Sequence, residues 1–103
     1  MSVLIVGKVR GDTAKFRQIL IDQADRVAQI AELSQAAGAL HHRFGVNDND
    51  GVVVFVDEWG SVEQFEKFFS QPELQAFVAE AGADTNSAPE FIITEAIASS
   101  DQF

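Results

Sequence analysis

Two spacings of apolar residues alternate along the chain and divide it into six predicted elements. Apolar side chains recur every three or four residues from Asp12 to about Ala37 and from Val62 to Ala81, as one buried helix face requires. Four shorter runs are rich in β-branched and apolar residues, which is typical of strands: 3–10, 39–46, 52–59 and 91–98. The predicted order is strand, helix, strand, strand, helix, strand.

Residues that favour helix ends and turns separate these runs. Asp12 is a good N-cap, because its carboxylate can accept a hydrogen bond from a free N–H of the first helical turn. Gly38 suits the position just after a helix. A capping-box pattern at Ser70 predicts that the second helix breaks there and restarts at Pro72. Asx and Gly residues at 47–51 predict a hairpin turn.

This order predicts an α+β domain of the ferredoxin-like βαββαβ type, with both helices on one face of a four-stranded antiparallel sheet. We expect residues 1–98 to form a single domain and residues 99–103 a short tail. Three of the strands are apolar on both sides; in the first, Val3 and Ile5 alternate with Leu4 and Val6. Two helices cover only one face, so we expect the other face to pack against a second copy.

The composition of the chain limits the classes of partner and of chemical site that are expected. The 103 residues carry a formal net charge of -9, which would on average repel nucleic acid and anionic membranes. The absence of cysteine excludes disulfides, thiolate metal sites and cysteine nucleophiles. The apolar run near the start is too short for a signal peptide or a membrane span, so we expect a cytoplasmic protein.

Two segments resemble the antibiotic biosynthesis monooxygenase family of dimeric α+β barrels: GALHHRF at 38–44 and VVVFVDEWGSVEQFEKFFSQPELQAF at 52–77. Glu58 and Trp59 fall on the Glu-x-Trp motif of this family with a shift of one residue, and His42 falls where many members carry Tyr. Many members also have a His nine residues after the Trp, where this chain has Phe68. The haem-degrading branch needs a histidine on the second helix, and this chain has none there, so haem oxygenation is not expected.

The resemblance implies a cofactor-independent monooxygenase that acts on an aromatic or quinol-type substrate in a pocket between sheet and helices. Such chemistry needs a dry apolar pocket, a base or hydrogen-bond donor, and an aromatic wall. The candidate catalytic residues are His42 as base, Trp59 as wall and Arg43 beside an anionic substrate. The resemblance also implies that no organic cofactor is needed. We expect no metal either, because the two adjacent histidines point to opposite faces of a strand and cannot chelate one ion without further ligands.

Each candidate also has a purely structural interpretation. Since His41 and His42 point to opposite faces, at most one lines a given pocket, and both could simply be hydrogen-bonded strand residues. Trp59 could be a core residue with its N–H bonded at the sheet edge. Arg43 could pair with an acid across the sheet, either Glu58 or Glu95. The alternative function is a non-catalytic dimeric barrel that binds a small apolar ligand or has a structural role.

Overall fold

A computed structural model describes all 103 residues and divides them into eight elements. The strands are β1 (Val3–Arg10), β2 (Ala39–Asn47), β3 (Val52–Trp59) and β4 (Glu90–Glu95). The helices are α1 (Thr13–Asp22), α2 (Ala24–Ala37), α3 (Val62–Phe69) and α4 (Pro72–Glu80). The predicted βαββαβ order is confirmed, each of its two helical segments being a pair of helices.

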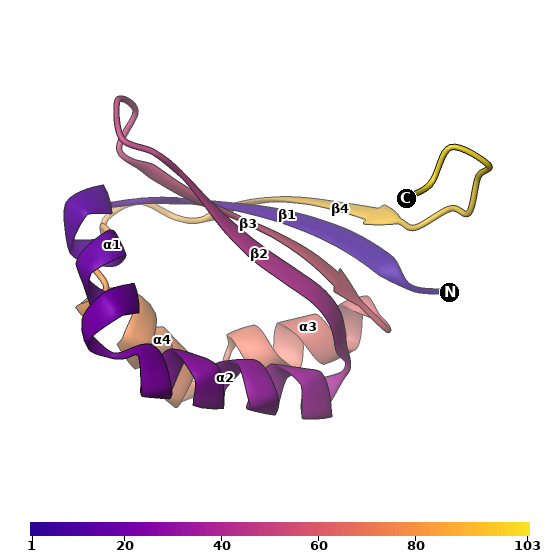
Figure 1. Ribbon diagram of the computed structural model, residues 1–103, viewed down its shortest axis with the longest axis horizontal. Coiled ribbons are helices and arrows are strands. Elements are labelled where there is room, and N and C mark those ends of the chain that lie inside the picture. Colours follow the sequence, from indigo (N-terminus) through magenta and orange to yellow (C-terminus); the bar gives the residue numbers. More distant parts are fainter.

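The break between α3 and α4 was predicted at Ser70, and it is found there, with Pro72 at the start of α4. The break between α1 and α2 at Gln23 was missed, because apolar spacing continues across it. A straight helix over 13–37 would be about 37 Å long. The interruption instead lets α1 lie beside the hairpin end of the sheet while α2 runs beneath the strands (Figure 1).

The four strands form an antiparallel sheet in the order β2-β3-β1-β4. All helices lie on one side of this sheet, and the other side is uncovered (Figure 1). We call the uncovered side the outer face; it carries the exposed apolar side chains of Leu4, Val56 and Ile92. The two-sided apolar pattern of the strands is therefore real, and one of its sides meets no other element of this chain.

The core lies between the sheet and the helices. One cluster joins Ile5 of β1 and Phe55 of β3 to aromatic side chains of α3, and a second joins Phe16 of α1 to Phe77 of α4. Gly7 of β1 lies opposite Phe55 in the register, and the Phe55 ring occupies the space that a side chain at Gly7 would need. The glycine thus lets this ring lie flat against the sheet.

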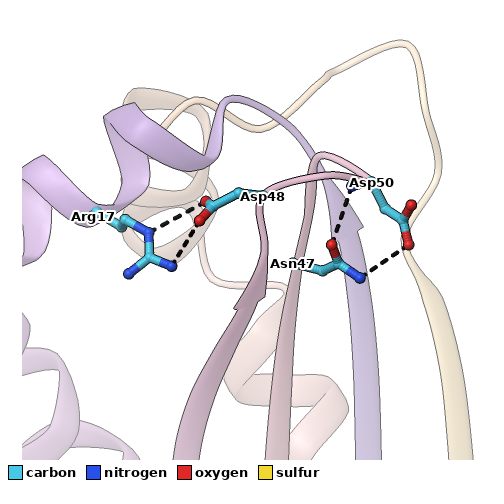
Figure 2. Close-up of polar contacts among 4 residues, drawn as sticks. All are labelled: Arg17, Asn47, Asp48 and Asp50. Atoms are coloured by element: carbon cyan, nitrogen blue, oxygen red, sulfur yellow. Dashed lines mark hydrogen bonds and ion pairs between the residues drawn. The ribbon is translucent and has the colours of Figure 1, made fainter.

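The β2–β3 hairpin is tied to α1 and within itself (Figure 2). Arg17 of α1 donates two hydrogen bonds to the Asp48 carboxylate, from Nε at 3.3 Å and from Nη2 at 3.0 Å. Asn47 donates to Asp50 and accepts from its backbone N–H, which closes the turn. The Arg17 hydrogen bond to Asp48 lowers the pKa of that carboxyl below its ordinary value.

The helices are too short and too polar for a membrane span.

Candidate functional site

A cavity of about 150 Å³ lies between the sheet and the helices. Eighteen of its 25 lining residues are apolar, so most of its wall cannot form hydrogen bonds through side chains. Aromatic rings from five elements contribute to this wall, among them Phe44 of β2, Phe55 and Trp59 of β3, and Phe65 of α3. The arrangement favours a flat apolar ligand.

Three side chains form a hydrogen-bonded chain along this wall. His42 Nδ1 and Asp57 Oδ1 lie 2.6 Å apart, and Trp59 Nε1 donates to Asp57 Oδ2 at 3.1 Å. His42 and Asp57 are directly opposite each other on β2 and β3, whereas Trp59 follows Asp57 by two residues and points to the same face. The sheet register therefore places all three groups together.

A β-bulge decides which histidine joins this chain. The register of β2 against β3 shifts between Ala39 and His41, so that two residues of β2 span one step of β3. Without the extra residue, His41 would lie opposite Asp57, and a one-residue slip sends every following side chain to the other face. The bulge thus turns His42 towards the helices.

The carboxylate of Asp57 is almost fully enclosed, with 8% of its side chain exposed, whereas 40% of the His42 side chain is exposed. Asp57 is also the one polar residue among the buried residues of the chain. A buried carboxylate is costly unless it is hydrogen-bonded, and here each of its oxygens has a partner. His42 lies at the rim of the cavity, and Asp57 lies behind it.

His41 and the candidate Arg43 lie on the other face of the sheet. His41 is 80% exposed on the outer face, with its Nε2 3.8 Å from Glu58 Oε1. Arg43 lies opposite Val56, also on the outer face, and is not part of the cavity wall. It forms no ion pair, so the alternative pairing with Glu58 or Glu95 across the sheet is not found. The predicted grouping of Arg43 with His42 and Trp59 is therefore wrong, because the alternation of the strand places Arg43 on the opposite face.

Sequence reasoning missed Asp57. The Glu-x-Trp motif was matched to Glu58 by shifting one residue, although Asp57 already stands two residues before Trp59. Alternation along β3 was the signal that could have found it, because an acid at that spacing shares a face with the Trp. Phe68, which replaces the His of many family members, is buried and packs against Trp59 with 5.5 Å between ring centroids.

No three His, Asp or Glu side chains gather in a way that could hold a metal ion.

The model of the antibiotic biosynthesis monooxygenase family matches residues 13–80, which is more than half of the chain. The chain belongs to this family. The match runs from α1 to the end of α4 and so includes every residue of the His42–Asp57–Trp59 chain. No curated protein sequence matches it significantly.

Solved structures with the same fold cover nearly the whole chain. SnoaB, a cofactor-independent oxygenase from Streptomyces nogalater, is 19% identical, with 98% of each chain covered and a TM-score of 0.63. An antibiotic biosynthesis monooxygenase is 13% identical, with 93% of this chain and 99% of that chain covered and a TM-score of 0.62. Rv0793 from Mycobacterium tuberculosis is 10% identical, with 98% and 100% covered and a TM-score of 0.62. At these identities the likeness establishes the α+β fold.

Proposed function

We propose that this protein is a cofactor-independent monooxygenase acting on a small aromatic, quinol-type substrate in the cavity between the sheet and the helices. The observation that carries the proposal is a histidine bonded to a buried carboxylate at the rim of a cavity whose wall is mostly apolar and aromatic. A base beside a dry pocket is what deprotonation of a phenol requires. The fold shared with SnoaB, a cofactor-independent oxygenase, supports the same reaction class.

The size of the cavity suggests the size of the substrate. An apolar protein cavity of about 150 Å³ can hold one benzene ring. The cavity here has about this volume. We therefore expect a single-ring phenol or hydroquinone to occupy this cavity with its hydroxyl at His42, whereas a larger ring system would need to extend out of the rim or displace wall residues.

In the proposed reaction, His42 accepts the proton of the substrate hydroxyl, and the phenolate passes one electron to O2. The two radicals combine to form a C–O bond. The O–O bond then breaks, so that one oxygen atom stays on the ring and the other leaves as water. A hydroquinone and O2 would give a hydroxyquinone and one water, with all electrons supplied by the substrate.

We also propose that the protein acts as a homodimer formed through the outer face. Leu4, Val56 and Ile92 lie together on three adjacent strands of this face, and each is at least 42% exposed. Contiguous apolar surface of this kind is typical of an interface. Pairing two outer faces would bury these side chains and leave both cavities on the helix side of each sheet.

Oxygen uptake by the purified protein tests the proposed reaction. We expect uptake with single-ring hydroquinones, a strong decrease in His42→Ala, and no change in His41→Ala, which removes the neighbouring histidine on the outer face. Trp59→Phe should retain the wall and lose part of the rate. Rates equal to those of buffer across the panel would refute the proposal. Saturable quinol binding without oxygen uptake would support the alternative of a non-catalytic ligand-binding barrel.

A further inference from the structure

We propose that Asp57 is a positioning residue that holds His42 in the tautomer with its proton on Nδ1, so that Nε2 is the atom that accepts the substrate proton. This inference rests on the proposed function for its catalytic consequence, although the tautomer itself is a property of the resting protein. It also assigns a role to Trp59 that differs from that of an aromatic wall: its N–H determines how the group at position 57 is oriented.

The hydrogen-bond geometry supports the first step. Asp57 Oδ1 lies 2.6 Å from His42 Nδ1, and an ionised carboxylate has only acceptor atoms. A carboxyl group is ordinarily a stronger acid than an imidazolium, so the shared proton stays on nitrogen. Nδ1 is therefore the donor. Nε2 of His42 has no hydrogen-bond partner in the protein, and the side chain is 40% exposed at the cavity rim, so this atom is free for substrate.

The second oxygen of Asp57 is occupied as well. Trp59 Nε1 donates to Oδ2 at 3.1 Å, and an indole N–H can only donate. The indole N–H is therefore not available to the substrate. Because the indole N–H can only donate, any side chain that replaces Asp57 must present a hydrogen-bond acceptor to Trp59.

This constraint makes Asp57→Asn a test with a definite outcome. The introduced amide has one oxygen and one NH2 group, and the oxygen must face Trp59 because the indole cannot accept. The NH2 group then faces His42 Nδ1, which must become an acceptor. The imidazole proton moves to Nε2, and the atom that should accept the substrate proton is blocked. In Asp57→Asn/Trp59→Phe the amide is free to turn, so its oxygen can face His42 and restore the original tautomer.

Other charged groups do not interfere with this pair. Arg10 and Asp12 also line the cavity, at the end of β1 and the start of α1, and neither is bonded to His42 or Asp57. His41 is adjacent to His42 in sequence, and Glu58 is adjacent to Asp57, but both side chains lie on the outer face. The tautomer of His42 is thus controlled by Asp57 alone.

The test is a two-bond ¹⁵N–¹H correlation spectrum of the imidazoles at a pH where both histidines are neutral, with His41→Gln used to assign the signals. We expect the proton of His42 on Nδ1 in the wild type and in Trp59→Phe, on Nε2 in Asp57→Asn, and again on Nδ1 in the double variant. A proton on Nε2 in the wild type would overturn the inference, and this result does not depend on any variant folding. An unchanged Nδ1 proton in Asp57→Asn would overturn it too.

Kinetics give a second readout. If the enzyme oxidises quinols, kcat should fall by about 10²- to 10⁴-fold in Asp57→Asn, the usual contribution of a positioned base, with KM little changed. The kcat of the double variant should be at least about tenfold higher than that of Asp57→Asn alone. Inactive wild type with the expected tautomers would refute the proposed function and leave the inference on Asp57 intact.

Discussion

Substitution of Gly7 by Ala tests how the aromatic side of the cavity is built. A Cβ at this position would lie 2.1 Å from Cζ and 2.2 Å from Cε1 of Phe55. Real Cβ contacts are almost never shorter than 3.0 Å, so the Phe55 ring must move by roughly 1 Å or more. This ring lies about 6.1 Å, centroid to centroid, from the rings of Phe65, Phe69 and Phe91, and its movement would therefore disturb all three.

Forcing an extra methyl group into a well-packed core typically costs about 1–3 kcal/mol. For a domain of this size, such a loss lowers Tm by about 5–20 °C. We expect this decrease for Gly7→Ala in thermal unfolding followed by circular dichroism at fixed protein concentration. Phe55 also lines the cavity, so quinol binding should weaken in parallel.

Gly45→Ala is the matched control, because it makes the same chemical change in a neighbouring part of the same sheet. No atom lies within 4 Å of the place where its Cβ would be. Its Tm should equal or slightly exceed that of the wild type, since alanine restricts the unfolded chain. Equal Tm values for Gly7→Ala and Gly45→Ala would show that the Phe55 ring does not depend on a glycine beneath it.

Three further predictions concern other parts of the molecule. Val56→Glu should give a folded monomer in sedimentation, whereas Ile21→Glu, the same kind of change at a more exposed position on α1, should remain dimeric; a dimeric Val56→Glu would exclude the outer face as interface. The Arg17–Asp48 pair lowers the pKa of Asp48 on folding, so its contribution to stability is complete at neutral pH and declines as the pH falls below about 4 and through the lowered pKa. Asp48→Asn should therefore lower Tm at pH 7 and have a progressively smaller effect on Tm below about pH 4. Ser61→Ala removes the N-cap acceptor of α3 and should cost about 1 kcal/mol in urea unfolding; no change would mean the cap is dispensable.

Much of the fold could be predicted from the spacing of apolar residues and from the residues that favour turns and helix ends. The turn chemistry at 47–51 and Pro72 placed the hairpin and the second helix break, because Asx, Gly and Pro restrict the backbone locally. The break at Gln23 could not be predicted in this way, since the residue lacks a strong local preference and apolar spacing continues across it.

The site was harder to predict than the fold. Alternation showed that only one of His41 and His42 could face the helices, but the choice depended on a β-bulge that adds one residue between Ala39 and His41. The same register places Arg43 on the outer face. Asp57 was missed because the family motif was matched to Glu58. The burial of the Asp57 side chain, which sets it apart from the other acids, is visible only in the packed structure.

The most direct test of the central claim is the reaction of the purified protein with a single-ring hydroquinone under ¹⁸O2, followed by mass spectrometry of the product. A cofactor-independent monooxygenase inserts one atom of O2, so we expect a hydroxyquinone carrying one ¹⁸O atom, and none of this product with His42→Ala. A quinone without ¹⁸O, formed at the same rate with and without the protein, would contradict the proposed function.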